Sequence, residues 1–154
     1  MPTALPVYCT TTLAKPVMHH LYIATLCLFN PQGQLLTVRK RGTQAWMLPG
    51  GKRDGDETPL QTLLRELKEE LQLPLQAADV VPLGTFSAAA ANEAATQVHA
   101  EVFVALQPLR QPVQAAAEIE ALQWIELAPP LPHALAPLLR EHIIPALRQR
   151  SGTA

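Results

Sequence analysis

The sequence has little of what marks several common classes of protein. It contains only two cysteines, Cys9 and Cys27, too few for a disulfide framework or a cysteine zinc site. Aromatic residues make up 5% of the 154 residues, and the formal net charge is −1. Without a surplus of positive charge, nothing indicates binding to nucleic acid or to an acidic membrane surface. We therefore expect neither a disulfide-stapled domain nor a nucleic-acid partner.

Long apolar runs are also lacking. The longest extends from Leu21 to Phe29, about half of the roughly 18 residues that a membrane-spanning helix needs. The first residues do not combine a basic segment with a following apolar one, so they predict no secretory signal. The expectation is a cytoplasmic protein with no membrane partner.

What is present suits one packed domain. Hydrophobic residues make up 48% of the chain, and a chain of this length buries enough surface to need no covalent staples. Fifteen prolines divide it, about twice the ordinary usage. We expect an N-terminal tail over residues 1–17 with a short strand near Val7, a single domain over residues 18–150, and a C-terminal tail over residues 151–154.

Hydrophobic patterning predicts a mixture of strands and helices. Residues 21–29 and 34–39 are rich in strand formers and flank a turn at Asn30–Gly33, which predicts a β-hairpin. Cys27 lies in the first of these strands and is expected to be a buried hydrophobe. Further elements are expected as strands at residues 80–86, 98–106 and 122–126, a small-residue loop at 88–96, and a helix at 134–148 kinked at Pro145.

The clearest helix is predicted over Thr58–Gln72. Thr58 can serve as its N-cap, Pro59 suits the first position, and Gln61 completes a capping box. Leucines recur at helical spacing and predict the face that turns toward the core. These leucines are Leu60, Leu63, Leu64, Leu67 and Leu71.

A second face of this helix is crowded with charge, because Arg65, Glu66, Glu69 and Glu70 lie close together on it. Two unit charges about 4 Å apart cost roughly 4 kcal/mol at an effective dielectric near 20. Arg65 can pair with one carboxylate, and a divalent cation can satisfy the others. Oxygen ligands of this kind favour Mg²⁺ or Mn²⁺ over softer metals.

A solvated charged face is the more common meaning of such a run when it stands alone. The residues ahead of the helix favour the cation instead. Gly50 and Gly51 allow a ligand or metal to approach the backbone closely, and Lys52 and Arg53 follow with charges suited to phosphate.

The glycine, arginine and glutamate positions together resemble the Nudix box. Its positions are matched in register by Gly51, Glu57, Arg65, Glu66, Leu67, Glu69 and Glu70. The segment Trp46–Gly50 is similar to the usual lead-in of that family. The one departure is Gln72, which stands where the family has a glycine. Such a glycine ends the helix in the left-handed conformation, where glutamine would cost roughly 1 kcal/mol or more, so we expect a local change at the helix end rather than loss of the metal.

The resemblance implies a fold and an activity. The fold is an α/β/α sandwich with a mixed β-sheet. The activity is hydrolysis of a nucleoside diphosphate linked to another group, by attack of water on phosphorus, with Mg²⁺ or Mn²⁺ as cofactor. The implied partner is a small nucleotide substrate, and the protein would be a monomer or homodimer. The alternative is a non-catalytic nucleotide-binding or sensor module on the same fold, although such members usually lose box glutamates, and here all remain.

The resemblance also implies roles for the box residues. Glu66, Glu69 and Glu70 would be the metal ligands, with the carbonyl of Gly50 as a further candidate. Arg65 would orient the glutamates and count with Glu66 and Glu69 among the catalytic residues. Support for the loop ahead of the helix would come from Glu57 and Gly51.

The general base varies within the family and stays open. Glu66 is one candidate, and Glu118 is another because similar members place a glutamate there, with Glu120 as its neighbour and competitor. Residues expected to contact phosphate or substrate are Lys52, Arg53, Trp46 and Asn92, with Phe86 as a further aromatic. Substrate identity also stays open, since His133 and Leu135 stand where some members use an asparagine to read an oxidised purine. ADP-ribose, dinucleoside polyphosphates and sugar nucleotides are equally compatible.

Overall fold

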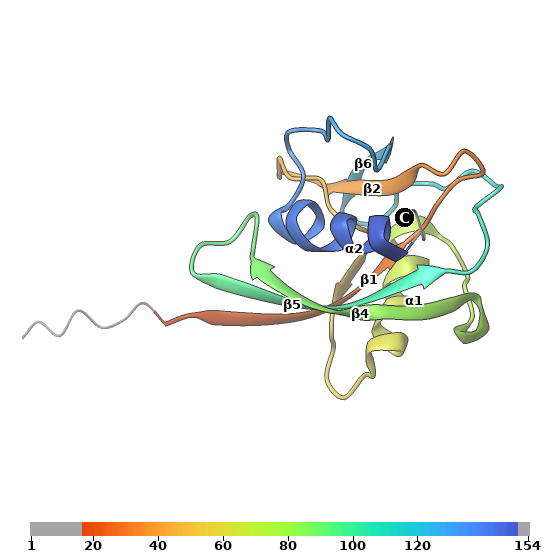
Figure 1. The fold of residues 1–154 in the computed structure, drawn as a ribbon. Coiled ribbons are helices and arrows are strands. Elements are labelled where there is room, and N and C mark those ends of the chain that lie inside the picture. The colour runs from red at the N-terminus through yellow and green to blue at the C-terminus, as the bar shows by residue number, and fades with distance from the viewer. Residues whose placement is uncertain (1–16, 151–154) are drawn as a thin grey trace, which may run out of the picture.

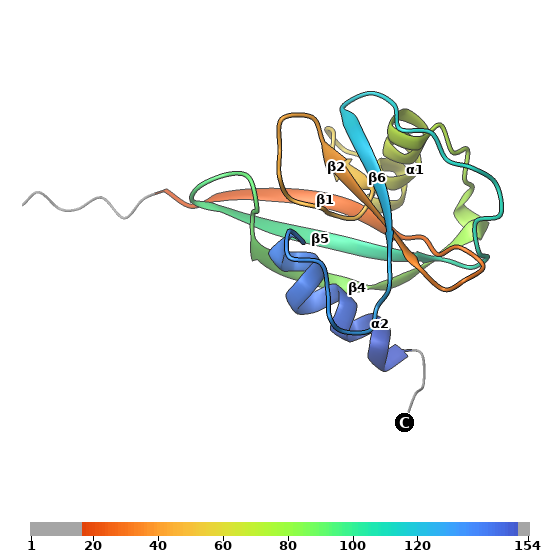
Figure 2. The same ribbon diagram turned by 90° about the horizontal axis from the view of Figure 1, so that it is seen from above.

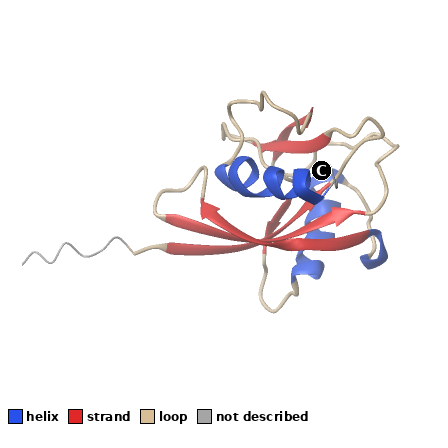
Figure 3. Cartoon of the chain, in the orientation of Figure 1, coloured by secondary structure: helices blue, strands red, loops and turns tan. Residues whose placement is uncertain are grey.

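The computed structural model of the chain describes residues 17–150, so the expected strand near Val7 and both tails lie outside the described residues except for residue 17. Strands alternate with a few helices along the chain (Figures 1 and 3). The elements are β1 (His19–Cys27), β2 (Leu35–Lys40), β3 (Gly50–Lys52), α1 (Pro59–Leu71), η1 (Ala77–Asp79), β4 (Val80–Ala89), β5 (Thr96–Ala105), β6 (Ile119–Ile125), η2 (Leu138–Ile143) and α2 (Ile144–Arg150).

The strands form two sheets. The larger has four strands in the order β3-β1-β5-β4, and β1 runs parallel to β5 while the other pairs are antiparallel. The smaller joins β2 and β6 in antiparallel fashion. Helices α1 and α2 lie on opposite sides of β1 and β5, as seen from above in Figure 2. This arrangement confirms the predicted α/β/α sandwich with a mixed sheet.

Strand β1 lies between the two halves of the core. Side chains alternate across a strand, so Leu26 packs with Leu63 and Leu67 on the side of α1, whereas Cys27 packs with Ile144 on the side of α2. Both faces of β1 are therefore apolar at this end, which explains the continuous apolar run in the sequence. Cys27 is fully buried, as predicted, and burial raises the pKa of its thiol to about 12.

The predicted hairpin is wrong beyond its turn. Asn30 does organise a turn, since its Oδ1 accepts a hydrogen bond of 2.9 Å from the backbone N–H of Gln34. Only an isolated bridge between Phe29 and Leu35 continues it, and β2 then pairs with β6. The reason is that both edges of β1 are occupied, one by β3 and the other by β5, so β2 is directed into the second sheet.

Other boundaries also differ from the prediction. Pairing with β5 extends β4 through Ala88 and Ala89, although alanine has little preference for strands. The loop expected at 88–96 is therefore shorter, and β3, which is rich in glycine, was not predicted. The last helix begins at Leu138 rather than at residue 134, and its first part is a π-helix. Pro145 follows that part and lacks the N–H that would continue an α-helical ladder through this point.

Helix α1 begins as predicted, but its C-terminal end does not show the local change expected from Gln72. The backbone N–H of Gln61 donates to Thr58 Oγ1 at 3.2 Å, and the N–H of Thr58 donates to Gln61 Oε1 at 2.9 Å, which completes the capping box. Gln72 caps the other end in the left-handed conformation, with φ 53° and ψ 36°. Within residues 17–150, no helix combines the length and the apolar character that crossing a membrane requires.

Replacing Gln72 with glycine is expected to stabilise the protein by about 1 kcal/mol, because glycine adopts the left-handed conformation without the steric penalty of a side chain. Urea unfolding followed by circular dichroism measures this change. Gln76→Gly is the matched control, because Gln76 has an extended backbone with φ −112°. If both substitutions lower the stability equally, strain at Gln72 is contradicted.

Candidate active site

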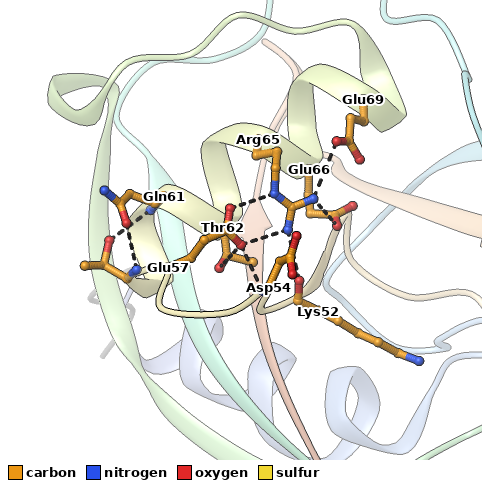
Figure 4. A network of polar contacts seen from close by, with 9 residues as sticks. Lys52, Asp54, Glu57, Gln61, Thr62, Arg65, Glu66 and Glu69 are labelled. Carbon is orange, nitrogen blue, oxygen red and sulfur yellow. Dashed lines mark hydrogen bonds and ion pairs between the residues drawn. The ribbon is translucent and has the colours of Figure 1, made fainter.

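Arg65 lies at the centre of a network of ion pairs along α1 (Figure 4). Its Nε donates to Glu57 Oε2 at 2.7 Å and its Nη2 to Glu57 Oε1 at 2.9 Å, which makes a bidentate pair. Its Nη1 donates to Glu66 Oε1 at 2.9 Å and reaches Glu69 Oε1 at 3.5 Å. One guanidinium thus links the loop ahead of the helix to two glutamates of the charged face.

Glu57 accepts further hydrogen bonds besides those from Arg65. Its Oε1 also accepts hydrogen bonds from the backbone N–H of Asp54 at 2.9 Å and from Thr62 Oγ1 at 3.1 Å. The hydrogen bonds from Arg65 are the largest influence on Glu57 and lower the pKa of its carboxyl to about 2. The sequence did not indicate the contacts of Asp54 and Thr62, because neither belongs to a pattern with a known partner at that spacing.

Glu70 differs from the other glutamates of α1 because it is buried, with only 1% of its surface exposed. Its Oε1 accepts a hydrogen bond of 2.9 Å from the backbone N–H of Gly50, whereas its Oε2 is buried with no partner. Burial raises the pKa of Glu70 to about 7 against the effect of the Gly50 hydrogen bond. The charge of Lys40 acts in the opposite sense to burial, but it does not outweigh the loss of solvation.

Gly51 makes room for Glu66. A Cβ atom at position 51 would lie 2.3 Å from Cδ of Glu66 and within 2.6 Å of both carboxylate oxygens. The carboxylate therefore rests against backbone that only glycine leaves open. The two glycines thus contact two different glutamates of α1, Gly50 by its N–H and Gly51 by its missing side chain.

The donor set suits a hard divalent cation. Glu66, Glu69, Glu70 and the carbonyl of Gly50 offer only oxygen atoms, which Mg²⁺ and Mn²⁺ prefer. The unpaired Oε2 of Glu70 is the observation that most favours a cation here. Within residues 17–150, no three His, Cys, Asp or Glu side chains are already gathered closely enough to hold a metal. Glu69, with a side chain 53% exposed, is the one most free to change its rotamer.

A cavity of about 260 Å³ lies beside these glycines. Most of its wall is apolar and comes from β1, the segment ahead of β3, and η2. Thr25 contributes a hydroxyl oxygen that is buried without a partner, which the sequence did not signal. Residues with polar or charged groups on its wall are Thr25, Lys40, Thr43, Gly50, Gly51, Lys52, Asn92, Glu93 and Glu118.

Only one of the two candidate glutamates outside the box lines the cavity. Glu118 lines the cavity and lies 3.3 Å from Lys40 Nζ, whereas Glu120 does not line it and pairs with Arg39 at 3.1 Å. The pairing of β2 with β6 shifts register between Arg39 and Lys40, which gives the two glutamates different partners. Glu118 is also close enough to Glu70 to raise its pKa.

Of the predicted substrate contacts, some line the cavity and others do not. Lys52 and Asn92 line the cavity, and Lys52 Nζ lies 3.7 Å from Glu93 Oε1 in the loop between β4 and β5. Trp46 does not line it, because its ring packs against the core on the side of α2 with the guanidinium of Arg39 5.5 Å from its centroid. Arg53 lines a separate hollow beside Tyr22. Phe86 packs against the core and does not reach the cavity wall.

Known proteins resemble this chain in part of its sequence and in its fold. Over 56 residues it is 43% identical to an RNA pyrophosphohydrolase of Hahella chejuensis, an alignment that covers 36% of this chain and 35% of that protein. An RNA pyrophosphohydrolase of a Marinomonas species is also 43% identical over 56 residues, with the same coverage. The chain therefore matches about a third of the length of these curated relatives.

Solved structures match over a longer part of the chain. A MutT protein from Methanosarcina mazei superposes with a TM-score of 0.71 at 22% identity and covers 87% of this chain and 97% of its own. A MutT NUDIX hydrolase from Burkholderia pseudomallei gives 0.64 at 24% identity, over 85% and 98%. These structures share the fold. Since the NUDIX domain model matches residues 18–147, this chain belongs to the Nudix family.

Proposed function

We propose that this protein is a Nudix pyrophosphohydrolase that depends on Mg²⁺ or Mn²⁺ and cleaves a nucleoside diphosphate linked to another group. The observation that carries the proposal is the shared wall: Gly50 and Gly51 contact Glu70 and Glu66 and also line the cavity. The carboxylate face and the space for a substrate are therefore adjacent. The names of the relatives, RNA pyrophosphohydrolase and MutT, support cleavage of a phosphate anhydride.

The residues of the box would have different roles in the reaction. Glu66, Glu69 and Glu70, with the carbonyl of Gly50, would hold the cation, which neutralises phosphate charge and lowers the pKa of bound water when present. Arg65 would orient Glu66 and Glu69 through its Nη1. Glu57 would keep the guanidinium in place through the bidentate pair, so its effect on the reaction would be indirect.

The cavity suggests how a substrate would lie. Lys52 would attract phosphate and Asn92 would offer hydrogen bonds, while the apolar wall would accommodate the remainder. Trp46 and Arg53 are left out of the proposed contacts because neither lines the cavity. We assign residues 18–150 to one domain that acts on a small nucleotide as a monomer or homodimer.

A phosphate-release screen tests the proposal. The panel contains ordinary and oxidised nucleoside triphosphates, RNA with a 5′-triphosphate, ADP-ribose, dinucleoside polyphosphates and sugar nucleotides, each with Mg²⁺ or Mn²⁺ and with a chelator. Substrates that release pyrophosphate are supplied with inorganic pyrophosphatase, and those that release only a phosphomonoester are supplied with a phosphatase. We expect at least one substrate to be hydrolysed only with metal. If no substrate is hydrolysed although nucleotides still bind, the result would contradict the proposed enzymatic activity and favour a nucleotide-binding sensor module.

Glu118 is expected to act as the general base, because it lines the cavity near Glu70. Glu118→Gln should lower kcat by about 100-fold, within the usual contribution of a general base, with little change in KM. Glu120→Gln is the matched control and should leave kcat unchanged, because Glu120 pairs with Arg39 away from the cavity. A Glu118→Gln variant that works at the parent rate would exclude Glu118 and leave Glu66 as the candidate.

A further inference from the structure

Two histidines of neighbouring strands meet on the larger sheet. His20 of β1 is exposed and His99 of β5 is half-buried, and His20 Nδ1 lies 2.8 Å from His99 Nε2. Their rings stack with centroids 5.1 Å apart. The two side chains share the face of Ala24, which packs with α1, whereas the cavity is lined from the opposite face by Leu21 and Ile23. The pair thus lies on the opposite face of β1 from the cavity, beside hollows that Lys52, Arg53 and Thr62 also line.

Neighbouring strands hold the ring of His99. Its Nδ1 lies 2.8 Å from Oγ of Ser87, the residue directly opposite on β4, and the ring of Tyr22 stacks on it at 5.0 Å. In the tautomer that donates from Nδ1 to Ser87, the lone pair of Nε2 points to His20. Histidines that bind metals usually donate their other ring N–H to an oxygen in this way, which fixes the ring for its ligand.

We propose that His20 and His99 form a binding site for a transition-metal ion of the zinc class, distinct from the carboxylates of α1. Imidazole nitrogens favour Zn²⁺, Ni²⁺ and Cu²⁺, whereas the oxygen ligands of the box favour Mg²⁺ and Mn²⁺. Two nitrogens bound to one tetrahedral ion at about 2.0–2.1 Å lie roughly 3.4 Å apart. The two nitrogens therefore need to separate by about half an ångström, and the rings need to turn so that both lone pairs meet at the ion.

Water would complete the coordination. Within the described part of the chain, no third His, Cys, Asp or Glu is gathered with the pair. Glu101 lies two residues beyond His99 on the same face of β5. It lines the adjacent hollow together with Arg53, so this hollow contains one negative and one positive side chain. A site with two protein ligands is open and exchangeable, unlike a closed structural zinc site, which takes four.

Titration calorimetry on the full, untagged chain tests the site, with Zn²⁺ added in the presence of excess Mg²⁺ to occupy the carboxylates. We expect one equivalent of Zn²⁺ to bind, His20→Gln and His99→Gln each to abolish that binding, and Ser87→Ala to weaken it about tenfold. His19→Gln is the matched control, because His19 is exposed but projects to the other face of β1. Each variant is first compared with the parent by thermal unfolding.

Ring resonances in the unsubstituted protein give a second measurement that depends on no variant. Zn²⁺ should shift the imidazole signals of His20 and His99 while those of His133 and His142 stay in place. The proposal is overturned if one equivalent of Zn²⁺ still binds to His20→Gln and His99→Gln, or if His19→Gln loses it equally. It is also overturned if Zn²⁺ shifts no signal of the pair.

Discussion

Replacing Glu69 with glutamine should lower the rate of metal-dependent hydrolysis by about 1,000-fold while leaving the fold intact. The rate should fall because the substitution removes one carboxylate from a set that stabilises charge at the reacting phosphate, and such preorganised charges are each worth about 100- to 1,000-fold. The fold should survive because the side chain is 53% exposed and Arg65 Nη1 approaches it only to 3.5 Å. Steady-state kinetics on the substrate found in the screen measures the first effect, and urea unfolding measures the second.

Glu69 separates catalysis from folding better than its neighbour does. Glu70→Gln would place an amide nitrogen where a buried oxygen already has no partner, so a loss of activity there would mix with a loss of stability. Glu141→Gln is the matched control, since Glu141 is an exposed glutamate on η2 away from the box. If Glu69→Gln hydrolyses substrate at the parent rate, Glu69 is not a metal ligand and the proposed set of ligands is wrong.

The sequence predicted best where the pattern is local. The capping box of α1 depends on residues three apart, which their spacing along the chain brings together. The network around Arg65 joins residues of the helix and of the loop just ahead of it, so their spacing along the chain already brings them together. Contacts between residues this close in sequence depend little on how the distant parts of the chain pack.

Partners distant in the sequence could not be predicted in the same way. Whether β2 returns to β1 depends on which strands already occupy the edges of β1, and no residue of β2 carries that information. The choice between Glu118 and Glu120 depends on a register shift opposite Arg39 and Lys40. Trp46 was a plausible base-stacking residue by type, but the bridge from its segment to Leu135 holds it in the wall of the core.

Gly50 and Gly51, at the start of the box, show how one sequence feature serves two purposes. Both were predicted to permit a close approach by a ligand or metal, yet each is also required by the protein itself. Gly50 has φ +143°, and a Cβ there would lie 2.1 Å from the carbonyl oxygen of Ala24, whereas a Cβ at Gly51 would meet only the carboxylate of Glu66. The first neighbour is backbone that cannot move alone, and the second is the end of a flexible side chain.

Gly50→Ala is therefore expected to destabilise the protein by about 4 kcal/mol, at the upper end of the effect of single substitutions. The new methyl group would separate β3 from β1, where Gly50 pairs with Thr25, and would disturb the hydrogen bond from its N–H to Glu70. Gly51→Ala is the matched control and should cost about 1 kcal/mol while displacing Glu66, so it should lose activity more than stability. Urea unfolding of both variants decides the matter, because equal stabilities would mean that β3 does not approach β1 as closely as the 2.1 Å clash requires.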